Sequence, residues 1–218
     1  MQAIESEIIN WYPEMSDMWS KVHPRGILSS SQPGGNFTSL PETLKKYVVR
    51  SDNAKPATQI NVFDSDGTQI YSIERYSGHS TLWTVYKLPS REQVAAVRCG
   101  LFQREVLFSN KEGIHSRSIG SSRLLYGGLP DRRFYLDDGA PYEWSRENQY
   151  LEKIINPGGG REETRQRVAL TKLLRQGRFE WELIVDKEFD TEIALTTALI
   201  SMLTAWKTSK HVTPGVLY

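Results

Sequence analysis

The segment that most constrains the fold is IALTTALISMLTAW, residues 193–206, which has fourteen consecutive positions without a charge. A helix that crosses a bilayer needs about 20 apolar residues, so this segment is too short to span a membrane. It is also too long for a typical strand, and its alanine, leucine and methionine residues favour a helix. We therefore predict a helix over residues 190–208, with Asp190 or Thr191 as its N-cap.

The predicted helix has no charged face. At about 100° per residue, small side chains gather on one side and large ones on the other, and neither side offers a charge to water. The small ones are Ala194, Thr197, Ala198, Ser201, Thr204 and Ala205, and the large ones are Leu195, Leu199, Met202, Leu203 and Trp206. A helix of this kind is normally enclosed by other parts of the protein.

The chain before the helix has the pattern of β-strands. Asp66-Gly67 and Asp138-Gly139 each separate two alternating runs rich in aromatic and β-branched residues, which predicts two hairpins. Further strand candidates follow one another with Gly, Pro, Asn or Asp between them: KKYVVRS, STLWTVYKL, EQVAAVRC, REVLFSN, GIHSRSI, QYLEKII, RVALTKLL and RFEWELIVD. For RVALTKLLRQ, a short helix is the alternative.

About ten strands before one buried helix predict a mainly β fold with a central helix. The expected architecture is a closed antiparallel β-barrel of about ten to twelve strands, wrapped around the hydrophobic C-terminal α-helix. Closure also removes the exposed sheet edges that would otherwise pair with other chains.

Three segments, in this order, have the pattern of a known superfamily. They are the D-S-D-G turn that leads into an I-Y-S-I strand at residues 64–73, the Y-E-W strand at 142–144, and the final strand and apolar helix at 178–206. Over about residues 45–210 the chain resembles the tubby C-terminal-like superfamily, which includes the LURP-one-related proteins and the phospholipid scramblases, and most of all an uncharacterised fungal group within it. The resemblance implies a barrel around a central helix and a non-enzymatic module that recognises anionic lipid head groups.

Two features of that superfamily have no counterpart in this sequence. Cys99 is the single cysteine, so the cysteine-rich acylation segment of the scramblases is missing. The basic pair with which tubby proteins bind phosphoinositides cannot be assigned to particular residues. A single cysteine also excludes an internal disulfide and a multi-cysteine metal site.

The chain divides into residues 1–41, an N-terminal segment with a linker, and residues 42–218, the predicted barrel domain. Residues 1–21 have apolar side chains near helical spacing, and they form either a helix packed on the barrel or a contact surface for a protein partner or a second copy. Residues 23–41 are rich in Ser, Gly and Pro and are predicted to be an irregular linker. The N-terminus does not read as a secretory signal, which predicts a cytoplasmic protein, peripheral to a membrane if it binds lipid.

The balance of charge gives no overall electrostatic reason to bind nucleic acid, because the net charge is +1. A local basic cluster lies in NPGGGREETRQR, residues 156–167, where Arg161, Arg165 and Arg167 follow three glycines. Backbone N–H groups and guanidinium groups together can bind the phosphate of an anionic lipid. The alternative is a solvated loop between two strands, in which the intervening glutamates pair with the arginines.

Lys45 and Lys46 belong to a second, weaker basic cluster. The four histidines are far apart and no nucleophile motif occurs, so neither a catalytic residue nor a metal or cofactor is predicted. The leading hypothesis is therefore a binding module for anionic phospholipid or a membrane surface. The alternatives are a protein-interaction or scaffold domain that uses residues 1–21, and a carbohydrate-binding or catalytic barrel with an unrecognised pocket.

Overall fold

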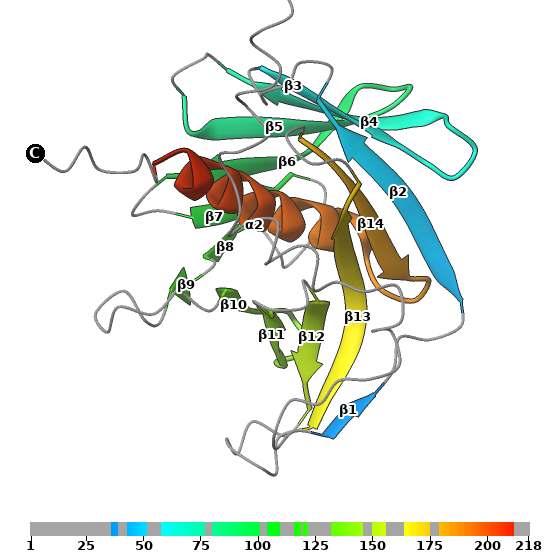
Figure 1. Cartoon of the computed structure of the whole chain (residues 1–218), viewed down its shortest axis with the longest axis vertical. Coiled ribbons are helices and arrows are strands. Elements are labelled where there is room, and N and C mark those ends of the chain that lie inside the picture. The colour runs from blue at the N-terminus through cyan, green and yellow to red at the C-terminus, as the bar shows by residue number, and fades with distance from the viewer. Residues whose placement is uncertain are drawn as a thin grey trace, which may run out of the picture.

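One large β-sheet curves around one helix in the computed structural model of the chain (Figure 1). The structure describes residues 36–38, 43–51, 58–76, 80–100, 104–109, 116–118, 120–121, 132–145, 150–155, 164–174 and 179–211. The strands are β1 (Asn36–Thr38), β2 (Leu44–Arg50), β3 (Gln59–Phe63), β4 (Gln69–Arg75), β5 (Leu82–Lys87), β6 (Glu92–Cys99), β7 (Arg104–Phe108), β8 (Ser116–Ser118), β9 (Gly120–Ser121), β10 (Arg132–Tyr135), β11 (Pro141–Trp144), β12 (Tyr150–Ile154), β13 (Thr164–Leu173) and β14 (Glu180–Asp186). The helix α2 spans Thr191–His211.

The strands form a single sheet in the order β8-β7-β6-β5-β4-β3-β2-β14-β13-β12-β11-β10-β9. All neighbours in this order are antiparallel, and β1 pairs with β13 in parallel. Each predicted strand run contains a strand, so these predictions are confirmed. The mainly β class with one C-terminal helix is confirmed with them.

Both predicted hairpins are confirmed, as β3–β4 and β10–β11. Gly67 has φ 81° and Gly139 has φ 71°, a region that costs a residue with a Cβ atom but not glycine. In each turn the glycine N–H donates to a carbonyl three residues earlier, that of Asp64 or Leu136. The Asp-Gly pairs therefore specify where the chain reverses.

Two expectations about secondary structure are wrong. The helical alternative for RVALTKLLRQ fails because most of it lies in β13, a long strand paired with β12 and β14. This strand already begins at Thr164, so Arg165 and Arg167 belong to the sheet and not to a loop. Within the predicted irregular linker, Asn36–Thr38 forms β1. This strand pairs with residues 164–166 of β13, whereas β14 pairs with residues 169–173.

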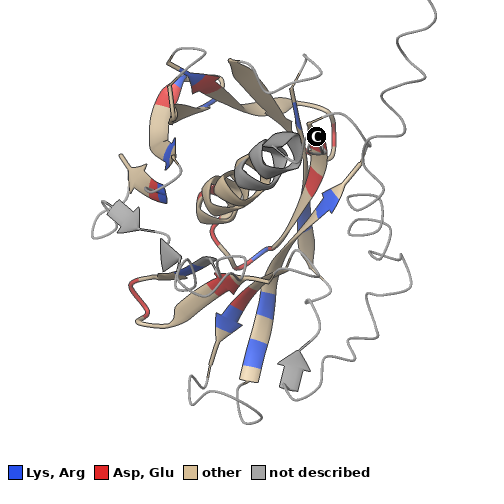
Figure 2. Ribbon diagram, turned by 60° about the vertical axis from the view of Figure 1, so that its left-hand side comes forward, with Lys and Arg blue, Asp and Glu red and all other residues tan. Residues whose placement is uncertain are grey.

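The helix lies inside the curve of the sheet, with β3 to β6 on one side and β10 to β13 on the other (Figure 1). Every residue from Glu192 to Leu203 is buried, on all sides of the helix. Figure 2 shows that the described part of α2 carries no charged side chain after its first turn. The prediction of an enclosed helix is confirmed for these turns, although α2 continues to His211, beyond the predicted end.

Hydrogen bonds tie the helix to the sheet as well. The indole N–H of Trp144 on β11 donates to the hydroxyl of Thr197 over 3.0 Å, and the hydroxyls of Tyr47 on β2 and Thr191 lie 3.3 Å apart. The two ends of the sheet path are β8 and β9, and among the described residues these two strands do not pair with each other. No helix in the described part of the chain is long and apolar enough to cross a membrane.

Candidate functional site

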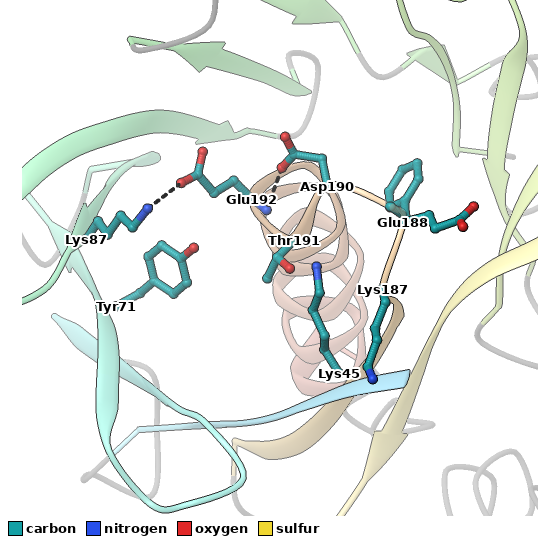
Figure 3. Close-up of a pocket in the computed structure, with 9 residues that line it drawn as sticks. Lys45, Tyr71, Lys87, Lys187, Glu188, Asp190, Thr191 and Glu192 are labelled. Carbon is teal, nitrogen blue, oxygen red and sulfur yellow. Dashed lines mark hydrogen bonds and ion pairs between the residues drawn. The ribbon is translucent and has the colours of Figure 1, made fainter. Parts of the chain in front are cut away.

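A pocket of about 550 Å³ opens where α2 begins (Figure 3). Its lining comes from three strands, from the turn between β14 and α2, and from the first turn of the helix. The lining residues are Lys45, Tyr71, Lys87, Lys187, Glu188, Phe189, Asp190, Thr191 and Glu192. Three lysines and three carboxylates therefore surround one cavity.

The alternation of β2 brings Lys45 into this pocket. Val49 is fully buried in the core, and Tyr47 reaches the helix through Thr191, so the odd positions of β2 face inward. Lys45 is the next position on that face, at the rim beside the helix. Lys46 points to the opposite face and is exposed. The structure therefore separates the two lysines that the sequence places together.

Two of the three carboxylates in the pocket, those of Asp190 and Glu192, already have partners at the start of α2. Oδ1 of Asp190 accepts hydrogen bonds from the backbone N–H groups of Glu192 over 2.8 Å and of Ile193 over 3.2 Å, which confirms Asp190 as the predicted N-cap. The carboxylate of Glu192 lies 4.0 Å from Nζ of Lys87. Figure 3 shows the carboxylate of Glu188 pointing away from Lys45.

Two ammonium groups in the pocket are not neutralised in this way. Within the described residues, the side chains of Lys45 and Lys187 form neither an ion pair nor a hydrogen bond. In Figure 3 the side chain of Lys45 extends toward the start of α2. The positive end of the helix dipole lies there, although the Asp190 carboxylate already caps two of its N–H groups.

Tyr71 contributes a neutral hydroxyl. Burial raises the pKa of Tyr71 far above its ordinary value, and the negative charge of Glu192 and the neighbouring Tyr47 and Asp190 act in the same direction. The phenol therefore stays protonated at neutral pH and can donate a hydrogen bond. No group of three or more metal-binding side chains occurs among the residues that the structure describes.

The predicted arginines lie elsewhere, in a network of ion pairs across β10 to β13. The strand register aligns Arg133 with Glu143, Glu143 with Glu152, and Glu152 with Arg167. Arg133 Nη2 lies 2.8 Å from Glu143, and Arg165 Nη1 lies 3.2 Å from Glu152 and 3.7 Å from Glu143. Arg167 Nε lies 3.4 Å from Glu152.

The centre of this arginine–glutamate network is shielded from solvent. Glu152 is 2% exposed and Arg167 is 5% exposed, and the guanidinium of Arg167 lies 4.0 Å from the centre of the Tyr150 ring. Burial raises the pKa of Glu152, although Arg165 and Arg167 both act to lower it. Two of the predicted anion-binding arginines thus bind internal carboxylates, and the third, Arg161, lies outside the described residues.

Sequence reasoning identified Lys45 but missed Lys87, Lys187 and Tyr71. These residues come from distant parts of the chain, and no local motif connects them. One usable signal was the Asp190 cap, because charged side chains near the start of a buried helix must lie at one end of the sheet that encloses it.

Comparisons with known proteins identify no family. No protein-family model matches the chain, and no curated protein matches it. A solved structure described as that of a protein from Arabidopsis thaliana is similar over 76% of this chain and 94% of that chain, at 10% identity and a TM-score of 0.39. A similarity this low carries no argument about fold or function.

Proposed function

We propose that this chain is a non-enzymatic binding module that recognises anionic lipid head groups at the surface of a membrane. The observation that carries the proposal is the pocket at the start of α2, where Lys45 and Lys187 have no acidic partner within the described residues. Lys87 lines the other side of the same pocket, and its contact with Glu192 is long enough, at 4.0 Å, to be exchanged for a phosphate oxygen.

The dimensions of the pocket support this proposal. The pocket is open and mostly polar, and its volume of about 550 Å³ lies in the range of about 300–1,000 Å³ that is usual for small-ligand sites. Lysine ammonium groups are common ligands of phosphate, and the protonated hydroxyl of Tyr71 adds a neutral donor.

The arginine–glutamate network is a weaker candidate for the same role. A lipid phosphate that approached Arg165 or Arg167 would have to displace the carboxylate of Glu152, which is almost fully buried. Arg161 stays a candidate from the sequence alone. We therefore centre the proposed site on Lys45 and Lys187.

Vesicle co-sedimentation of the full chain tests the proposal. Neutral phosphatidylcholine vesicles are compared with vesicles that also contain a phosphoinositide, at low and moderate salt. We expect binding only to the anionic vesicles, with an affinity that falls as salt rises. Each of Lys45→Gln and Lys187→Gln should weaken binding about fivefold, since a basic residue near an anionic surface contributes about 1 kcal/mol.

Lys46→Gln is the matched control, because it removes the same charge from the opposite face of the same strand. The proposal is wrong if the parent protein binds neither vesicle, or if Lys46→Gln weakens binding as much as Lys45→Gln does. Loss of binding on Arg161→Gln alone would instead move the site to the segment between β12 and β13.

The proposed function agrees with the resemblance to the tubby C-terminal-like superfamily, and we propose membership of that superfamily together with a closed barrel. Ser116–Ser118 pairs with β7 at one end of the sheet path, and Gly120–Ser121 pairs with β10 at the other. One short segment of chain thus reaches both ends of the sheet, which supports closure at residues 116–121. Amide exchange at these residues as slow as in the core strands would support closure, and fast exchange would contradict it.

A further inference from the structure

The end of the sheet where β5 begins, β6 ends and β7 begins has its own group of inward-facing polar residues. Trp83 on β5 is 1% exposed and aligned with Val97 on β6, which is aligned with Val106 on β7. Arg104 lies two residues before Val106 and therefore on the same inner face. Its register partner Cys99 is 2% exposed and contacts the backbone of α2 at Ile200.

Three donor nitrogen atoms at this end have no acceptor among the described residues. Nε1 of Trp83 and both Nε and Nη1 of Arg104 are buried, and no polar atom among the described residues bonds to any of them. Leaving one buried donor unsatisfied costs about 1–3 kcal/mol, and more if the group is charged. Nothing among the described residues offsets that cost, and a bound acceptor group would offset it.

The carboxylate that is next in sequence does not face these donors. Glu105 follows Arg104 in sequence but points to the outer face, where its carboxylate lies 3.7 Å from Arg98. A second positive charge lies close by, because the guanidinium of Arg75 is 5.4 Å from the centre of the Trp83 ring. The inner face here thus combines positive charge and N–H donors with apolar walls from Val97 and Val106.

We propose that Arg104 and Trp83 bind the carboxylate of an organic acid. The planar guanidinium fork matches two carboxylate oxygens, and a carboxylate accepts hydrogen bonds without donating any. Because β6 lies between β5 and β7, the Cα atoms of Trp83 and Arg104 lie about 10–12 Å apart. The long arginine side chain and the indole reach across this distance from opposite sides. Arg104 as a whole is partly exposed, but its Nε and Nη1 atoms are buried, so a ligand has to displace the side chains that cover them.

The test follows the indole N–H signals of the tryptophan-labelled full chain by NMR while hexanoate is added at constant ionic strength. We expect a saturable downfield shift of the Trp83 signal, identified by its loss in Trp83→Phe. Trp144 is the internal control, because its indole N–H already donates to Thr197 and should not move. Arg104→Gln should weaken binding about tenfold or more, since a charged hydrogen bond is lost.

Hexanol, which has the same alkyl chain without the carboxylate charge, is the matched control ligand. The proposal is overturned if hexanoate produces no saturable shift, if hexanol shifts Trp83 equally, or if Arg104→Gln binds hexanoate as the parent does. Arg104→Lys keeps the charge but removes the fork, and we expect intermediate affinity from it. This second variant keeps the test decisive if the spectrum of Arg104→Gln indicates that it does not fold.

Discussion

The two basic clusters that the sequence singles out end in opposite electrostatic situations. Arg165 and Arg167 lie on β13, and Glu152 on the adjacent strand binds both. Lys45 lies on β2 at the rim of the pocket and has no acidic partner among the described residues. The arginines are the denser cluster in sequence, yet the lysine has the more available charge.

The difference follows from strand register. Glu152 is the register partner of Arg167, so the pairing of β12 with β13 brings a carboxylate and a guanidinium together at this position. The register partner of Lys45 is Val185, which offers no charge, and the turn that follows β14 brings a second lysine. A count of basic residues in a segment therefore does not predict how many of them can bind a ligand.

The largest expected effect comes from removing the shared carboxylate. Glu152→Ala leaves the guanidinium of Arg167 buried without its counter-charge, and we expect a loss of about 3–5 kcal/mol in the free energy of unfolding. Denaturant titration measures the loss. A loss below about 1 kcal/mol would mean that water reaches Arg167 and that its charge is available after all, which would remove the contrast with Lys45.

The next largest effect tests whether α2 fills the interior of the sheet and so confines Lys45 to the rim of the pocket. The helix fills the interior, so the inner face of β2 can hold a charge only beyond the end of α2. Ala198 is fully buried, and Ala198→Leu should overpack the interior and cost about 1–3 kcal/mol in denaturant titration. A fully stable variant would show space around the helix.

The pH dependence of stability separates a buried carboxylate from an exposed one. Burial raises the folded-state pKa of Glu152 above its ordinary 4.5, so its contribution to stability is present below that pH and is lost as pH rises through the raised value. Burial of Asp138 also acts to raise its pKa, but hydrogen bonds from Lys153, Tyr142 and the Ala140 N–H outweigh it and lower the pKa below the ordinary 3.8.

The contribution of Asp138 therefore has the opposite sign: it is present above pH 3.8 and is lost as pH falls through the lowered value. We expect Asp138→Asn to flatten the acid limb of the stability profile and Glu152→Gln to flatten the decline above pH 4.5. Urea titrations over a series of pH values measure both. The same change in both variants would contradict the assigned directions.

Much of the fold was predictable because its determinants are local. Two Asp-Gly turns, strand alternation and an uncharged C-terminal segment are each readable within a few residues, and they correctly predict the two hairpins, the strands and the buried helix. The long β13 was misjudged at its start, because TRQR lacks an apolar alternation and is held in the sheet by ion pairs to β11 and β12.

The candidate site was much less predictable, because its residues meet only through pairing between distant strands. Lys45, Lys87 and Lys187 are far apart in sequence and share no motif. The orphan donors of Trp83 and Arg104 are similar in this respect, since their inward orientation depends on the register of β5, β6 and β7. Sequence patterns predict which face a residue takes but not which residues share it.

The smallest expected effect is on the stability of the lysine variants, and it completes the contrast with Glu152. Lys45 makes no ion pair with the described residues, so Lys45→Gln should change the free energy of unfolding by less than about 0.5 kcal/mol. Lys46→Gln should do the same. Equal stability with unequal vesicle binding would assign Lys45 to ligand recognition alone. A cost above about 1 kcal/mol for Lys45→Gln would instead make it part of the internal ion pairing, as Arg167 is.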